Sequence, residues 1–127
     1  MTANPFMVGG PSSFDTRLME VGGGRILCKG GAEGFQALGI LPGALGAGSA
    51  GLGIAIKISD GDLASHTDGK YGHARPAVAL EALRQLGILN RQELQKMEAY
   101  GPEFDIHNWR KLKVGQGQPV FQLVKGA

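Results

Sequence analysis

The sequence predicts an α+β fold in which helices cover an antiparallel sheet. Residues 52–59, LGIAIKIS, alternate between apolar and other side chains, which is typical of a half-buried strand. Apolar side chains recur at helical spacing over residues 12–21 and 76–87. Of the 22 glycines, 17 precede residue 73, so tight turns belong to the first part of the chain and helices to the second.

The first expected element is a helix over residues 12–21. Ser12, with Asp15 three residues later, forms a start that resembles a capping box. An apolar stripe follows, made of Phe14, Leu18 and Val21. Three glycines, residues 22–24, then end the helix.

Three strands are expected next, and they form an antiparallel meander. They cover residues 25–29, RILCK, then 34–41, GFQALGIL, and then 53–58, with small-residue turns between them. The alternation is cleanest in the third strand, so we expect this strand at the centre of the sheet. Its core face carries Ile54, Ile56 and Ile58.

Helices dominate the second half. Pro76 lies in the first turn of a helix that Gly87 ends, and Asn90 with Glu93 caps a further helix through about Tyr100. Gly101-Pro102 breaks that helix. Residues 119–125 form either a last strand or an extended tail. The 127 residues suit a single domain, 1–127, with its own core.

Charge and composition exclude several classes of protein. The net charge is +2, from 13 basic and 11 acidic residues. The one basic cluster, residues 110–113, is too short for a patch that binds a nucleic-acid groove and is more typical of a solvated turn. We therefore expect no nucleic-acid partner. No run of about 18 apolar residues and no secretion signal occurs, which predicts a cytoplasmic protein without a membrane partner.

Other motifs favour structural roles. The spacing G-x-G-x-x-G occurs at residues 46–51, but a strand-like segment follows it, whereas a dinucleotide site needs a helix there. The three histidines, His66, His73 and His107, do not share a metal-ligand spacing with Cys28, so we expect no metal and no cofactor. Cys28 should be a small buried thiol.

No activated nucleophile is evident. A serine needs a base such as a lysine three residues later on one helical face, and no serine of the chain has one. Thr67 and Lys70 have the spacing, but they lie in a glycine-bearing segment that does not hold a rigid pair.

Lys29 is the strongest candidate for chemistry. It closes an apolar strand and precedes Gly30-Gly31, which resembles the Lys-Thr-Gly strand motif of penicillin-recognising serine enzymes. Glycine lets a substrate approach the backbone, and a fixed ammonium stabilises developing negative charge. The alternative is a surface lysine at the end of a strand.

The wider context resembles the L-asparaginase II family, the rhizobial-type asparaginases. The resemblance spans roughly residues 4 to 124 and rests on two blocks in this order: Lys-x-Gly-Ala-Glu-Gly at residues 29–34 and Gly-Ile-Ala-x-Lys-x-x-Asp-Gly at residues 53–61. It implies hydrolysis of L-asparagine to L-aspartate and ammonia on a serine β-lactamase-like fold, and a homo-oligomer. In that family the serine nucleophile and a metal cluster lie in an earlier part of the chain.

The resemblance assigns roles to residues of the first block. Lys29 corresponds to the catalytic lysine, and Gly30, Gly31 and Glu33 are expected to bind substrate. Asp15 stands where rhizobial members carry cysteine, so we transfer no metal to this chain.

Two functions follow from the resemblance. In the first, the chain is the C-terminal portion of an asparaginase, binds L-asparagine and is inactive without an N-terminal portion or a partner chain that brings the serine. In the second, it is a non-catalytic stand-alone module of the same fold that binds a partner chain.

Overall fold

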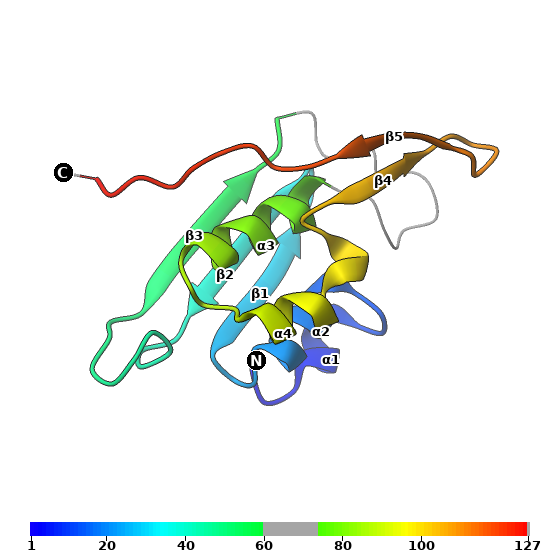
Figure 1. The fold of residues 1–127 in the computed structure, drawn as a ribbon. Coiled ribbons are helices and arrows are strands. Elements are labelled where there is room, and N and C mark those ends of the chain that lie inside the picture. The colour runs from blue at the N-terminus through cyan, green and yellow to red at the C-terminus, as the bar shows by residue number, and fades with distance from the viewer. Residues whose placement is uncertain (60–73, 127) are drawn as a thin grey trace.

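The computed structural model describes residues 1–59 and 74–126 (Figure 1). The elements follow in this order: α1 (Pro5–Gly9), α2 (Phe14–Val21), β1 (Ile26–Gly31), β2 (Phe35–Ile40), β3 (Leu52–Lys57), α3 (Ala74–Gln85), α4 (Arg91–Lys96), the 3₁₀ helix η2 (Glu98–Tyr100), β4 (Phe104–His107) and β5 (Lys113–Gly117). The predicted α+β class is confirmed. The expectations for His66, His73, Thr67 and Lys70 concern residues outside the described ones.

The three expected strands form an antiparallel sheet in the order β1-β2-β3. The central strand is therefore β2, and the prediction that residues 53–58 lie at the centre is wrong. Alternation reports that one face of a strand is buried, and it has the same period at an edge. In a meander the middle strand in sequence is also the middle strand in space.

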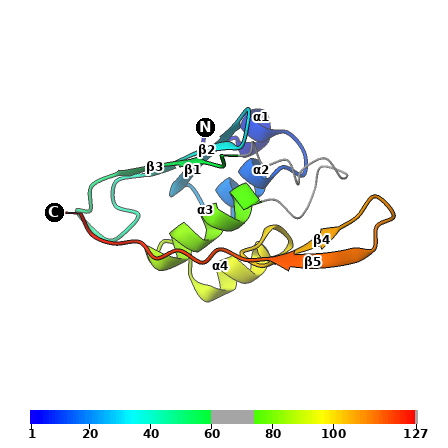
Figure 2. The ribbon, with the colours of Figure 1, turned by 90° about the horizontal axis from the view of Figure 1, so that it is seen from above.

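Helices α3 and α4 lie on one side of this sheet (Figure 2). The core fills the space between these helices and the sheet, and alternate residues of each strand point into it. Ile56 is buried, while Ile54 and Ile58 are partly buried and pack against the core, so the predicted core face of β3 is confirmed. The largest fully buried side chains are Leu18, Met19, Ile26, Leu80, Leu83, Ile88 and Met97.

The helix caps confirm one prediction and correct another. Asn90 and Glu93 form the predicted capping box. At α2 the N-cap is Ser13 and not Ser12: the Ser13 hydroxyl accepts a hydrogen bond from the Thr16 N–H at 3.1 Å. Ser12 has φ 58°, so it belongs to the turn that precedes the cap.

The helix that starts after Asn90 is shorter than predicted. It ends at Lys96, and the 3₁₀ helix η2 replaces its last turn up to Tyr100. Gly101 follows with φ 137°, a conformation that favours glycine, and terminates the helical segment before Pro102 as expected.

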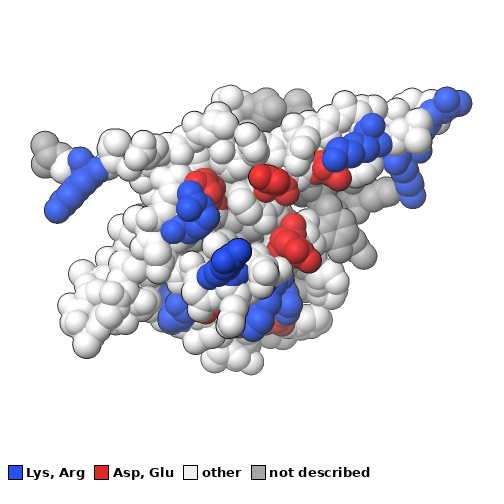
Figure 3. Space-filling model, viewed as in Figure 1, with Lys and Arg blue, Asp and Glu red and all other residues white. Residues whose placement is uncertain are grey.

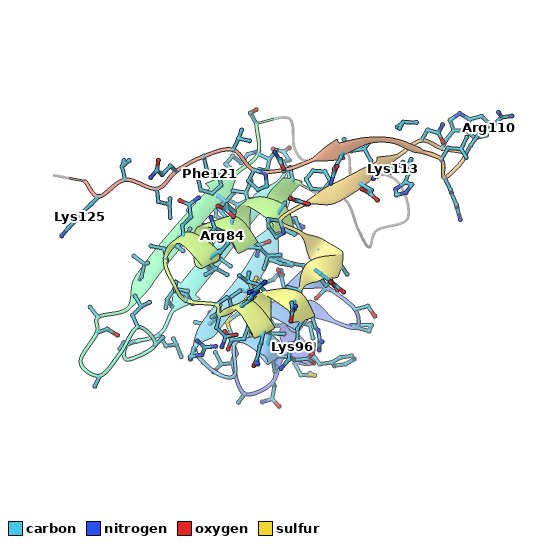
Figure 4. All side chains as sticks on the ribbon, in the orientation of Figure 1. Arg84, Lys96, Arg110, Lys113, Phe121 and Lys125 are labelled. Atoms are coloured by element: carbon cyan, nitrogen blue, oxygen red, sulfur yellow. The ribbon has the colours of Figure 1, made fainter. Side chains whose placement is uncertain are left out.

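The C-terminal region forms a projecting hairpin and a tail. β4 pairs with β5 in an antiparallel hairpin that was not predicted, and residues 110–113 lie in and beside its turn, as expected of a solvated basic cluster. Residues 118–126 run on without strand pairing, so the tail is the alternative that the structure adopts. The Gln85 side chain holds it on α3 by accepting from Leu123 N–H and donating to Phe121 C=O. Figure 4 shows Phe121 above Arg84 at this crossing.

Charges of both signs are interspersed on the face that carries α3 and α4 (Figure 3). Glu81 and Arg84 pair on α3, while Arg25 of the α2–β1 connection pairs with Glu93 of α4. On this face the described residues therefore form no single-sign patch of the kind that binds a nucleic-acid backbone.

Candidate active site

The candidate site begins at Lys29, near the end of the edge strand β1. Its side chain is exposed on the sheet face opposite to α3 and α4, whereas the neighbouring Cys28 is buried in the core. The predicted alternation of these two residues is confirmed. The Lys29 ammonium donates to the C=O of Gly30, with 2.8 Å between Nζ and O.

Two helices reach Gly30 from the other side. Its N–H donates to Asp15 of α2, with 2.6 Å between N and Oδ2. A Cβ atom at residue 30 would lie 3.1 Å from Nη1 of Arg75 and 3.4 Å from the same Asp15 oxygen, so a larger residue would crowd both. Nη1 of Arg75 also donates to the carbonyls of Gly31 and Phe35, at 3.1 and 3.2 Å. Glycine at residue 30 thus permits close contact between α2, α3 and the strand end.

A tight turn follows the strand. Three residues, 32–34, connect the paired Gly31 and Phe35. Glu33 has φ 57° and Gly34 has φ 73°, and the Phe35 N–H donates to the Ala32 C=O. The Lys57 ammonium donates to the Glu33 and Ile58 carbonyls and fastens the turn to β3. The predicted site residues Lys29, Gly30, Gly31 and Glu33 therefore lie together at one end of the hairpin. Their roles toward a substrate stay predictions.

A buried polar cluster lies beneath the strand end. Oδ1 of Asp15 accepts from the Cys28 thiol at 3.3 Å and from Nε2 of Gln36 at 3.0 Å. Burial raises the pKa of the Cys28 thiol well above its ordinary value, and the negative charge of Asp15 raises it further. Cys28 therefore remains a protonated donor and not a thiolate nucleophile.

Sequence reasoning missed three residues around the site, Asp15, Gln36 and Arg75. Asp15 was noted at the helix start and as a departure from the rhizobial sequences. An acidic residue in a first helical turn is ordinary, because it complements the helix dipole, so nothing connected Asp15 with Gly30. Gln36 did give one. It shares its parity on β2 with the buried Leu38 and Ile40, so a polar side chain stands at a core position.

The described residues show other roles for the candidate nucleophiles and ligands. Ser13 caps α2, and Ser49 accepts from the Leu45 N–H in a loop. Within residues 1–59 and 74–126, no three His, Cys, Asp or Glu side chains gather as a metal site would require.

Residues 46–51 lead into β3 and not into a helix, so the dinucleotide-binding alternative is wrong. No helix in the same ranges combines the length and apolar character of a membrane span.

Comparisons with known proteins give one result. The model of a protein family described as L-asparaginase II matches residues 1–119. A search of curated proteins finds no match.

Proposed function

This chain belongs to the L-asparaginase II family, and we propose that it takes part in hydrolysing L-asparagine to L-aspartate and ammonia. The observation that carries the proposal is the environment of Lys29. Its ammonium donates to the Gly30 carbonyl at the glycine-containing end of an edge strand, and its side chain is exposed on the face opposite to the core.

The chemistry of amide hydrolysis explains why such an ammonium is useful. Attack on the side-chain amide of asparagine places negative charge on the former carbonyl oxygen, and a preorganised cation stabilises this charge more than it stabilises the ground state. Lys29 binds a neutral carbonyl, and none of the described carboxylates pairs with it, so the described residues leave its charge in place. The role proposed for Lys29 is electrostatic.

Glycines complete the expected binding surface. Gly31 has no side chain, and a Cβ there would meet the Phe35 ring at 3.0 Å. Gly31 and Glu33 are exposed, whereas Gly30 is crowded by Asp15 and Arg75, so the accessible backbone beside Lys29 is that of Gly31 and the turn. The Glu33 carboxylate suits the α-ammonium group of an amino-acid substrate.

The serine nucleophile is proposed to come from a segment other than the described residues, because the serines found there cap a helix, line turns or lack a lysine partner. Such a segment would face Lys29 across the sheet surface that α3 and α4 leave uncovered. An antiparallel sheet with helices on one side and Lys-Gly-Gly on an edge strand supports a serine β-lactamase-like arrangement as the complete fold.

A second candidate function is a non-catalytic module that binds a partner chain. The observation that favours it is the same uncovered surface, on which Phe35 is 39% exposed. The projecting hairpin adds Trp109, which is 82% exposed, and a homo-oligomer built through these surfaces is part of this proposal.

Ammonia release from L-asparagine separates these functions. The pure chain should release none above buffer, and mixing it with the serine-bearing N-terminal portion of a family member should produce turnover. Tight association of the two portions without turnover would favour the non-catalytic module. Hydrolysis by the pure chain, abolished by a substitution within it, would contradict the proposed origin of the nucleophile.

A further inference from the structure

Asp15 is a buried carboxylate to which the proposed chemistry assigns no role. It is 9% exposed, and it accepts hydrogen bonds from the Gly30 N–H, the Cys28 thiol and the Gln36 amide. Burying a carboxylate costs free energy unless donors surround it. The shortest of its three contacts, 2.6 Å, goes to Gly30, the residue next to Lys29.

Gly30 connects Asp15 to Lys29. The N–H and C=O of one strand residue point to the same side of the strand, and in Gly30 both point away from β2. Asp15 binds this N–H, and the Lys29 ammonium binds this C=O. The carboxylate and the ammonium are thus anchored to the two polar groups of one glycine, the residue type whose backbone is freest to rotate.

We propose that Asp15 is a positioning residue for Lys29: its carboxylate fixes the Gly30 backbone and thereby the carbonyl that places the Lys29 ammonium. This inference rests on the proposed function, because Lys29 is the group that is placed. Asp15 itself lies in the core and does not touch the substrate.

The orientation of Gln36 supports an organised acceptor at Asp15. Gln36 is completely buried, and its Nε2 lies within hydrogen-bond distance of both Asp15 and Cys28. Its Oε1 is buried without a hydrogen-bond partner among the described residues. The side chain therefore leaves one acceptor unsatisfied while its donor group serves Asp15, which fits a site organised around the carboxylate.

Because Gln36 Oε1 has no hydrogen-bond partner among the described residues, Asp15→Asn can serve as a conservative variant. In Asp15→Asn, one side-chain oxygen can still accept from the Gly30 N–H. The new amide group can donate to Gln36 Oε1 once the Gln36 amide turns over. Asp15→Asn should therefore keep the strand end in place, whereas Asp15→Leu fills the same space and removes the acceptor.

Amide hydrogen exchange on the whole chain tests the contact directly. The Gly30 amide should be protected although it points away from β2, and Asp15→Leu should speed its exchange by about tenfold or more. Asp15→Asn should retain the protection. Thr16→Val is the matched control, because Thr16 lies in the same helix but its hydroxyl donates to Gly10 C=O at 2.7 Å. Fast exchange at Gly30 in the unmodified chain would overturn the proposal, even if Asp15→Leu failed to fold.

Turnover of the reconstituted enzyme tests the consequence. Folded Asp15→Leu should lower kcat by about tenfold or more with little change in KM, because a displaced ammonium stabilises the transition state less well. Asp15→Asn should restore most of kcat. If Lys29→Met abolishes turnover and folded Asp15→Leu does not lower kcat, the positioning role is wrong while the proposed function stands. If Lys29→Met leaves turnover unchanged, the electrostatic role of Lys29 fails, and the positioning role fails with it; if the mixed portions of the unmodified enzyme show no turnover, the proposed function itself fails.

Discussion

Cys28 and Lys29 are adjacent in sequence and occupy opposite environments. Cys28 is 1% exposed and its thiol donates a hydrogen bond to Asp15, while Lys29 is exposed on the other face of the sheet. Because side chains of a strand alternate, a single residue step separates a core position from a candidate site position. The same strand therefore supplies both the anchoring cluster and the exposed cation.

The Cys28 thiol should make stability depend on pH in the alkaline range. Its pKa is raised in the folded chain, so the folded state holds the proton more tightly than the unfolded state. The stabilisation is complete below the ordinary thiol pKa of 9.0 and is lost as the pH rises above it. The free energy of unfolding should fall by up to about 1.4 kcal/mol per pH unit there. Urea unfolding on both sides of this pH measures the effect.

Cys28→Ala is the control, because other alkaline titrations are common to both chains. The part of the pH dependence that Cys28 contributes should disappear in this variant. Identical pH dependence in the two chains would show that the thiol is not held protonated by its surroundings.

At the scale of elements, the local sequence pattern predicted which face of β3 is buried but not the position of β3 in the sheet. Alternation identified the face of β3 that packs against the core, because each residue of a strand faces one side or the other. It did not identify β3 as an edge strand, because pairing depends on residues elsewhere in the chain. The hairpin of β4 and β5 was missed because β4 alternates over four residues only, FDIH, and β5, KVGQG, carries a single apolar side chain larger than glycine.

Ile56→Asp should destabilise the chain strongly. Ile56 is the most buried isoleucine of β3, and a carboxylate there would lack a partner in the core. We expect a loss of about 3 kcal/mol or more in the free energy of unfolding, a large share of an ordinary domain's stability.

Ala55→Asp provides the comparison, because residue 55 is exposed on the opposite face of the same strand. This change should alter stability by less than about 0.5 kcal/mol. Urea denaturation of both variants measures the difference. An equal loss in the two would contradict the assignment of the core face.

At the scale of the whole molecule, the site joins segments that are distant in sequence. The glycine block at residues 29–34 was recognisable as a motif, because its residues are consecutive. Asp15 and Arg75 reach Gly30 only through the packing of α2 and α3 on the strand, which no local pattern encodes. The uncovered sheet face is likewise a property of the assembled layers (Figure 2).

The same arrangement determines which lysine is a suitable control for Lys29. Lys57 lies on the same face of the sheet, but its ammonium binds the Glu33 carbonyl and so fastens the turn of the candidate site. Lys96 ends α4, on the side of the sheet that the helices cover (Figure 4). A change at Lys96 therefore removes one positive charge without touching the hairpin.

The most direct measurement is the turnover of L-asparagine by a reconstituted or full-length enzyme that carries Lys29→Met, Lys29→Arg or Lys96→Met. Methionine keeps the length of the stem and removes the ammonium, so folding should survive. Losing a preorganised charge should then lower kcat by about a hundredfold or more, roughly 3 kcal/mol. Lys29→Arg should restore little, because a planar guanidinium does not replace a compact ammonium, and Lys96→Met should match the unmodified enzyme. Equal turnover for Lys29→Met and the unmodified enzyme would contradict the account and make Lys29 a surface lysine.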